Sequence, residues 1–193
     1  MKPELHLCFA TAESLFRYHD PVRIHGYCAT CPDHGRVWSC PPFGEPVLAG
    51  FPAWTCALLV TLKTWMGPET RRDDMIEGFH ASRRSFRGLL VGVERCLPGT
   101  TALVAGYCQG CEACCRPQGH PCRAPSELRY SLEAVGFDVS ALTEQLVGQR
   151  IQWPKEGNPD YLLTVGALLC PEMGRAEEAR QAMMEAWEER QHG

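Results

Sequence analysis

The sequence has little lysine and no long apolar run. Most of its positive charges come from arginine, and the formal net charge is -4 at pH 7. A negative balance argues against a protein that binds nucleic acid through its charge. No stretch of about 20 apolar residues is present, so the sequence predicts no membrane-spanning helix. Neither nucleic acid nor a membrane is therefore expected as a partner.

The first twenty residues lack the features of a secretory signal. They contain no basic start followed by an unbroken apolar stretch and a small-residue cleavage site. The expected compartment is therefore the cytoplasm, which is reducing. Closely spaced cysteines in that compartment more often hold a metal or perform redox chemistry than form permanent disulfides.

The motifs of several common enzyme classes are also missing. There is no Gly-rich dinucleotide fingerprint, no P-loop and no HExxH zinc motif. The C-x3-C-x2-C spacing of radical-SAM enzymes is absent as well. The sequence thus names no reaction, and an iron–sulfur-dependent oxidoreductase is one option among several.

What the chain does have is cysteine. Twelve of its 193 residues are cysteine, and five of the twelve fall in the stretch "GYCQGCEACCRPQGHPCRAP" at 106–125. A chain of this length that is 45% hydrophobic can bury a core without covalent staples. We therefore expect a single domain over 1–193, with cysteine-rich modules at 27–43 and 107–125.

The hydrophobic pattern predicts an α/β or α+β domain, with a small mixed sheet and flanking helices. Residues 54–65 read as a buried strand, 69–95 as a long amphipathic helix and 101–106 as a short strand that leads into the second module. Residues 161–170 form another apolar strand, and a C-terminal helix is expected from Gly174 onward. This order places the second module at a strand end, where α/β proteins commonly carry their sites.

Shorter elements are expected between the second module and the last strand. Ser126 and Gly136 have the character of an N-cap and a terminating residue around a short helix. Ser140 is expected to cap a second short helix, and the prolines and glycine of 150–160 predict a loop.

The second module has the cysteine spacing of an iron–sulfur site. Cys108, Cys111 and Cys114 form C-x2-C-x2-C, and Cys122 follows after an insertion. Three thiolates at such intervals suit a loop wrapped around a cubane, with the remote cysteine capping the last iron. Zinc sites more often use two separated C-x2-C pairs. The spacing therefore favours a [4Fe–4S] cluster here, with zinc as the alternative, and Cys115 is expected to point away.

The first module, "YCATCPDHGRVWSCPPF", offers three thiolates from Cys28, Cys31 and Cys40. Three ligands leave one coordination position unassigned, and zinc is a stronger competitor at this site. Either the position is open to water or substrate, or another residue fills it. The candidates for that fourth ligand are Cys8, Cys56, Cys170 and His34.

The two motifs in this order resemble the prokaryotic family of predicted metal-binding proteins called domain of unknown function 2284 (DUF2284). The resemblance covers the chain from about Tyr27 to Cys170. That family usually has an aromatic before the glycine of the first motif, where this chain has His34, and a residue other than cysteine at the position of Cys115. Neither departure removes a proposed ligand. The resemblance implies metal binding, of iron–sulfur type, through Cys28, Cys31, Cys40, Cys108, Cys111, Cys114 and Cys122.

The favoured hypothesis is an iron–sulfur protein with a redox or electron-transfer role, holding one or two [4Fe–4S] clusters. An open-site cluster at the first module that binds substrate is a variant of it, and a structural zinc module that presents an interaction surface is the alternative. The partner is expected to be a redox protein or a small-molecule substrate, and a homodimer stays open. Arginines along 69–95 could dock an acidic partner, although a solvated helix face is the simpler interpretation.

Overall fold

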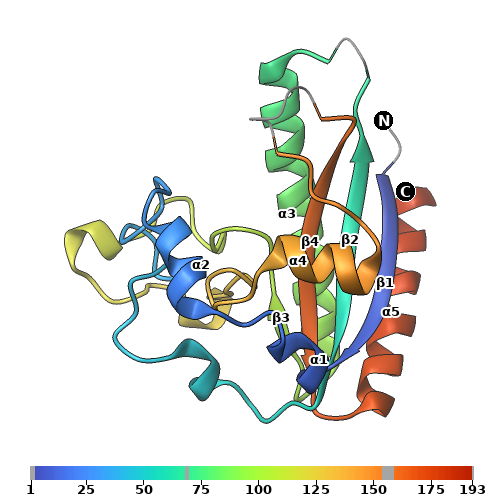
Figure 1. Ribbon diagram of the computed structural model, residues 1–193, viewed down its shortest axis with the longest axis horizontal. Helices are drawn as coiled ribbons and strands as arrows, with labels where there is room; N and C mark the ends of the chain where they lie inside the picture. The colour runs from blue at the N-terminus through green and yellow to red at the C-terminus, as the bar shows by residue number, and fades with distance from the viewer. Residues whose placement is uncertain (1–2, 68–69, 154–158, 193) are drawn as a thin grey trace.

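The computed structural model describes residues 3–67, 70–153 and 159–192. Figure 1 shows a sheet with helices on both faces and a group of loops to one side of it. In chain order the elements are β1 (Pro3–Thr11), α1 (Ala12–Phe16), α2 (Pro21–Cys28), the 3-10 helix η1 (Val47–Gly50), β2 (Cys56–Trp65), α3 (Arg72–Cys96), β3 (Thr101–Leu103), the 3-10 helices η2 (Arg116–Gln118) and η3 (Pro125–Glu127), α4 (Val139–Leu142), the π-helical turn η4 (Thr143–Val147), β4 (Tyr161–Cys170) and α5 (Met173–His192).

The sheet has four strands in the order β1-β2-β4-β3, and each neighbouring pair is antiparallel. The expected α+β domain with a small sheet and flanking helices is confirmed, although the described strands pair only in antiparallel fashion and do not form a mixed sheet. Strands β2 and β3, joined by α3, do run in the same direction. They are not neighbours, because the C-terminal strand β4 inserts between them.

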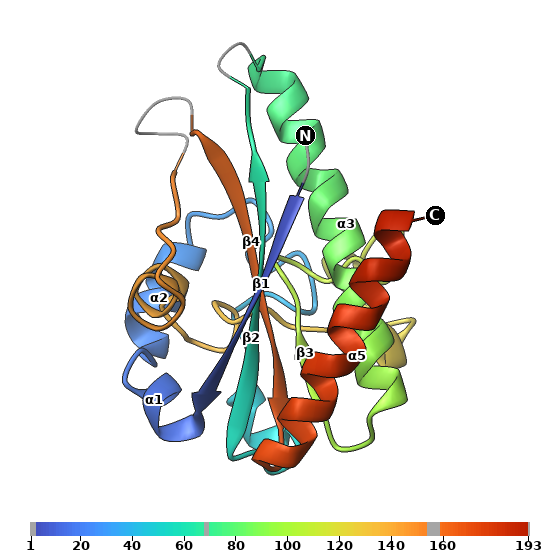
Figure 2. The ribbon, with the colours of Figure 1, turned by 90° about the vertical axis from the view of Figure 1, so that its right-hand side faces the viewer.

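Helices cover both faces of the sheet. Helices α3 and α5 lie on one face, and α1 and α4 lie on the other (Figures 1 and 2). Strand β2 is buried on both sides, since Leu58 and Val60 belong to the core under α3 and α5 while Leu59 belongs to the opposite core. A continuous apolar run is the pattern expected of such a strand. Among the described residues, no helix combines the length and apolarity needed to cross a membrane.

Helix α3 approaches β4 closely at Gly166. A Cβ built there would lie 2.5 Å from the carbonyl oxygen of Leu103 and 2.8 Å from the ring of Phe86. Only glycine leaves room for this contact, and Phe86 is fully buried in it. The contact fixes α3 over the strands, and with it the arginines that reach the cysteine loops.

The long elements match the sequence prediction, and the short ones match it less well. The strands over 54–65, 101–106 and 161–170, the long helix and the C-terminal helix are confirmed within a few residues, although residue 69 lies outside the described part. Strand β1 and helix α2 were not predicted.

Two predictions for the shorter elements are wrong. No helix begins at Ser126, because the chain there forms η3 and then turns before Phe137. The second short helix exists, but Asp138 caps it, with Oδ1 accepting a hydrogen bond of 2.9 Å from the N–H of Ala141. The loop predicted at 150–160 has no regular structure where it is described, and 154–158 fall outside the described residues.

The two cysteine-rich loops lie together beyond β3, on the side away from β1 (Figure 1). One loop follows α2 and the other follows β3, so residues far apart in sequence become neighbours. Hydrogen bonds join the two loops, including one of 3.1 Å from Trp38 Nε1 to the carbonyl of His120. The fold thus brings both cysteine modules to one place outside the apolar core.

Candidate metal centre

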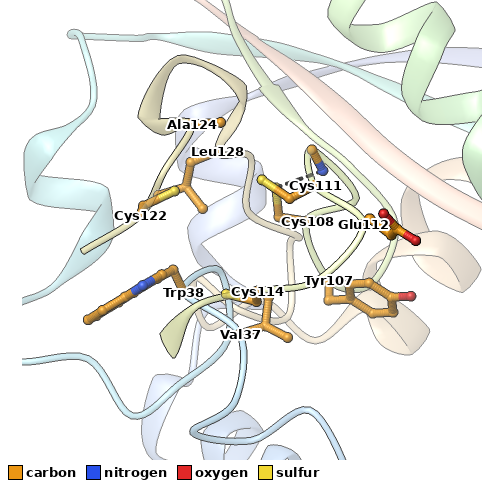
Figure 3. Close-up of a pocket in the computed structure, with 11 residues that line it drawn as sticks. Val37, Trp38, Tyr107, Cys108, Cys111, Glu112, Cys114, Cys122, Ala124 and Leu128 are labelled. Carbon is orange, nitrogen blue, oxygen red and sulfur yellow. Dashed lines mark hydrogen bonds between the residues drawn. The ribbon is translucent and has the colours of Figure 1, made fainter. Parts of the chain in front are cut away.

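The four cysteines of the second module line a single pocket (Figure 3). The pocket has a volume of about 70 Å³. Val37 and Trp38 from the first loop close one side, and Tyr107 and Leu128 contribute further apolar surface. The cysteines that line it are Cys108, Cys111, Cys114 and Cys122. The x2 spacing therefore does bring these thiols around a common space.

The backbone around Cys108 is held on two sides. Its N–H donates a hydrogen bond of 2.7 Å to Ser39 Oγ, and its sulfur lies 3.4 Å from the carbonyl oxygen of Glu127. Glu127 is itself held by α3, because Arg87 donates to its carbonyl at 3.0 Å and to its carboxylate at 3.1 Å. Arg95 also pairs with that carboxylate. Helix α3 thereby anchors the far end of the second loop.

Repulsion among the thiolates of this pocket favours the binding of a cation. Desolvation raises the pKa of Cys111, and negative charge on Cys122, Cys108 and Cys114 raises it further. Four thiolates around one space repel one another unless positive charge lies between them. A bound metal supplies that charge, and it requires the thiolate form of its ligands.

All twelve cysteines are free thiols, so the loops contain no disulfide. Among the described residues, no three His, Cys, Asp or Glu side chains converge closely enough to hold a single ion.

The first module forms a second cysteine group. Cys28 is the last residue of α2, and the N–H of Cys31 donates to its carbonyl at 2.9 Å. Burial is the main cause that raises the pKa of Cys40 to about 12. A hydrogen bond from Ser39 lowers this pKa, and negative charge on Asp33, Cys31 and Cys28 raises it. Cys28 and Cys31 lie near enough to Cys40 for their charge to act on it, but no three ligand side chains of the described residues converge on one ion, so a metal site here stays a prediction. A thiol with such a pKa becomes a thiolate at neutral pH only with strong positive charge beside it.

Helix α2 places Cys28, and sequence reasoning missed that helix. Asp20 caps it, accepting a hydrogen bond of 3.0 Å from the N–H of Arg23, and Pro21 occupies the first turn, so the start carried a recognisable signal. The helix docks on the segment before α4, where His25 Nε2 lies 2.8 Å from the carbonyl of Ala134. Cys28 therefore ends a packed helix, and the C-x2-C step is not at a helix N-terminus as in thioredoxin-type motifs.

Glu133 lies near the first module and was not predicted. Burial is the main cause of the raised pKa of Cys28, and the charge of Glu133 is the next. Burial also raises the pKa of Glu133 itself, while its hydrogen bonds and Arg83 act in the opposite direction. No local sequence pattern links Glu133 to Cys28, because more than one hundred residues separate them.

The distant cysteines considered as a fourth ligand lie in the sheet. Cys56 and Cys170 are opposite one another on β2 and β4, both buried, and burial raises the pKa of Cys170 to about 12. Cys8 lies on β1, with its sulfur 3.2 Å from the carbonyl oxygen of Leu146. His34 stays in the turn of the first loop, where its N–H donates to the carbonyl of Cys31 at 3.1 Å.

Cys115 points away from the pocket, as expected. It is 4% exposed, and its sulfur contacts the carbonyl oxygens of Pro121 at 2.9 Å and His120 at 3.5 Å. Both contacts lie within the turn that carries the chain from Cys114 to Cys122.

Arg116 clamps the two loops together. It belongs to the second loop, and its guanidinium donates to three carbonyl oxygens of the first, those of Val37 at 2.7 Å, Cys40 at 2.5 Å and Pro42 at 2.6 Å. The guanidinium also lies 5.0 Å from the centre of the Trp38 ring. Because one of these carbonyls belongs to Cys40, the second loop holds the backbone of a cysteine of the first.

The arginines of α3 are not simply a solvated helix face. Arg83 is buried at 7% exposure, and Arg87 and Arg95 bind Glu127, whereas Arg84 is exposed. The arginines on one side of the helix thus hold the cysteine loops. Part of the positive charge on this helix is therefore used within the protein and is not available to an acidic partner.

Comparison with known proteins agrees with this picture. Searches of curated proteins and of solved structures each found no significant match. A family model described as predicted metal-binding protein matches residues 17–170, which include both cysteine modules and three of the four strands. The chain therefore belongs to the DUF2284 family of predicted metal-binding proteins.

Proposed function

We propose that the protein is an iron–sulfur protein with a redox role. The single observation that carries the proposal is the pocket of the second module, which is lined by four cysteines at C-x2-C-x2-C spacing with a remote fourth. Cys108, Cys111, Cys114 and Cys122 would hold a [4Fe–4S] cluster there. When bound, such a cluster supplies one-electron transfer at a potential set by its surroundings.

The side chains around the pocket suit such a centre. Trp38 and Tyr107 lie against it and limit the access of water, which is one determinant of a cluster's potential. The N–H of Gly110 points to the sulfur of Cys108 at 3.4 Å, and hydrogen bonds to ligand sulfurs are another determinant.

Cys28, Cys31 and Cys40 would hold a second metal. The hydrogen bond from Cys108 to Ser39 joins a ligand of one centre to the residue beside a ligand of the other. Two centres in such close contact suit the transfer of electrons between them, with a redox protein or a small-molecule substrate as the outside partner. A fourth ligand position left open at this second centre would allow a substrate to bind.

The test is anaerobic reconstitution with iron and sulfide. The loaded protein should be brown, contain about four iron and four sulfide per [4Fe–4S] cluster, and give an electron paramagnetic resonance signal on reduction. Cys111→Ala should remove the signal of one centre and leave the other. Cys96→Ala is the matched control, because Cys96 is also exposed but lies at the end of α3.

Two results would contradict the proposal. One is a colourless protein that takes up zinc in preference to iron, which would support the structural zinc module. The other is a Cys111→Ala variant with the same iron and sulfide content as the Cys96→Ala variant.

A further inference from the structure

Glu127 contacts the sulfur of Cys108 through its main chain. The Cys108 thiol donates a hydrogen bond of 3.4 Å to the carbonyl oxygen of Glu127. The N–H of Gly110 donates to the same sulfur, also at 3.4 Å. A Cβ on Gly110 would lie 2.8 Å from the Cβ of Glu127 and 3.2 Å from its carbonyl oxygen, so only glycine allows this close approach. The residue that follows the second module therefore packs directly against the first cysteine of that module.

Arg87 of α3 holds the same carbonyl. Its Nη2 donates to the carbonyl oxygen of Glu127 at 3.0 Å and to the carboxylate of that residue at 3.1 Å. The carbonyl oxygen thus accepts hydrogen bonds both from the Cys108 thiol and from the guanidinium. No more than these two contact distances separate the cation from the sulfur.

The group around Glu127 carries more positive than negative charge. Arg87 and Arg95 both pair with its one carboxylate, which leaves one positive charge in excess. The neighbouring Arg129 is paired separately with Glu94. The Nε of Arg87 is also buried and has no hydrogen-bond partner among the described residues. A partly buried cation whose charge is not fully balanced is costly unless further negative charge lies beside it.

Cys108 cannot keep its hydrogen bond to the carbonyl as a metal ligand. A ligand sulfur is a thiolate, so it has no proton to donate. The partial negative charge of the Glu127 carbonyl oxygen then faces a negative sulfur, which is unfavourable. Arg87 offsets this repulsion, because its positive charge acts on the carbonyl oxygen and on the sulfur behind it.

We propose that Arg87 is a positioning residue for the metal centre of the second module, and that it supplies the counter-charge of the Cys108 ligand through the Glu127 carbonyl. The inference rests on the proposed function only in requiring a metal at that centre, and it holds for iron or zinc. Partners outside the ligand set orient metal ligands and tune the metal that they bind. Arg87 belongs to this group, since it reaches the ligand sulfur through Glu127.

Metal retention is the first readout and does not depend on activity. Protein loaded with zinc, or with iron and sulfide, is mixed with a chelator, and the loss of metal is followed over time. Arg87→Gln should lose metal from one centre at least about tenfold faster than the wild type, in line with the 10- to 100-fold effects typical of such partners. Arg87→Lys keeps the charge without the planar fork, so its rate should fall between those two. Arg84→Gln removes the same charge from an exposed position on α3 and is the matched control.

Opposite charge changes at the two partners separate an electrostatic role from a structural one. In the iron-loaded protein, Arg87→Gln removes a positive charge near Cys108 and should lower the ratio of reduced to oxidised centre at a fixed potential by at least about threefold. Glu127→Gln removes a negative charge and keeps the carbonyl, so it should raise that ratio. Loss of the ion pair is common to both variants and by itself would shift the ratio in one direction. Arg84→Gln should leave the ratio unchanged.

A Cys111→Ala background shows on which centre Arg87 acts. That background lacks the centre of the second module, so Arg87→Gln should cause no further acceleration of metal loss. The inference is overturned if the acceleration persists there, if Arg87→Gln behaves as Arg84→Gln does, or if Arg87→Gln and Glu127→Gln shift the reduced fraction in the same direction. Circular dichroism checks that each variant is folded. Should Arg87→Gln not fold, Arg87→Lys decides, and wild-type metal retention in that variant overturns the inference.

Failure of the proposed function gives a different result. A second module that takes zinc and no iron–sulfur cluster contradicts the redox role, while the order of metal loss among Arg87→Gln, Arg87→Lys and Arg84→Gln still decides the role of Arg87. A second module that binds neither metal in the wild type contradicts both proposals.

Discussion

The sheet region and the cysteine region of this protein are stabilised by different forces. Apolar side chains fill both faces of the sheet. In 105–130, all of which the structure describes, Cys115 is the only buried apolar side chain. The cysteine region is held instead by guanidinium groups, chiefly those of Arg116 and Arg87. The fold and the metal chemistry can therefore be damaged separately.

The largest effect that separates the two regions is expected from the core. Phe86→Ala removes a fully buried ring from between α3 and β4 and should lower the free energy of unfolding by about 3–5 kcal/mol. Chemical denaturation followed by circular dichroism measures it. Ile76→Ala, on the same helix but 47% exposed, should change stability little. Equal effects of the two substitutions would mean that the sheet does not depend on this core.

A smaller, local effect is expected from the clamp between the loops. Arg116→Ala removes three hydrogen bonds to carbonyls of the first loop. The free energy that holds the two loops together should fall by about 1.5–3 kcal/mol, the range for hydrogen bonds to a charged group. Hydrogen exchange should speed up over 33–43 while β2 and β4 stay protected. Arg123→Ala is the control, since Arg123 is exposed in the same loop. Faster exchange throughout the sheet would mean that Arg116 stabilises the whole fold and not the loops alone.

The smallest effect is the dependence on pH of the anchor at Glu127. Its hydrogen bond from Arg87, with further help from Arg95, holds its pKa below the ordinary 4.5. A lowered folded pKa means that the stabilisation is complete above pH 4.5 and is lost as the pH falls toward the folded value. Hydrogen-exchange protection at 106–128, corrected for the intrinsic exchange rate at each pH, should therefore decrease with acidification in that range before the sheet responds.

Glu127→Gln is the matched variant for this measurement. Its hydrogen-exchange protection in 106–128, corrected for the intrinsic exchange rate, should no longer change with pH over the same window, because the titrating group is gone. An unchanged pH profile in the variant would assign the effect to other groups.

The long elements of the fold could be predicted because their signal is local. The apolar run of β4 and the periodicity of α3 are contained within each segment, and the side chains they bury need no other part of the chain to be recognised. Strand β1 is a partly exposed edge strand with weaker alternation, so its pattern gave little signal. The antiparallel order was not predictable, because nothing local indicates that β4 lies between β2 and β3.

The candidate site, like the fold, could be predicted only where its signal is local. Spacing alone grouped Cys108, Cys111, Cys114 and Cys122, because a short loop limits how far its own thiols can separate. The contacts that join the loops were not predictable, since Ser39 and Cys108 are 69 positions apart and Val37 and Arg116 are 79 apart. Metal binding by the seven cysteines stays a prediction, and the reconstitution experiment decides it.

The clamp of Arg116 has a consequence for how the protein acquires its metals. A metal that orders the second loop also fixes the guanidinium that holds the carbonyl of Cys40, so the first loop then has less conformational entropy left to lose. If both loops bind metal as proposed, uptake at one centre should therefore favour uptake at the other.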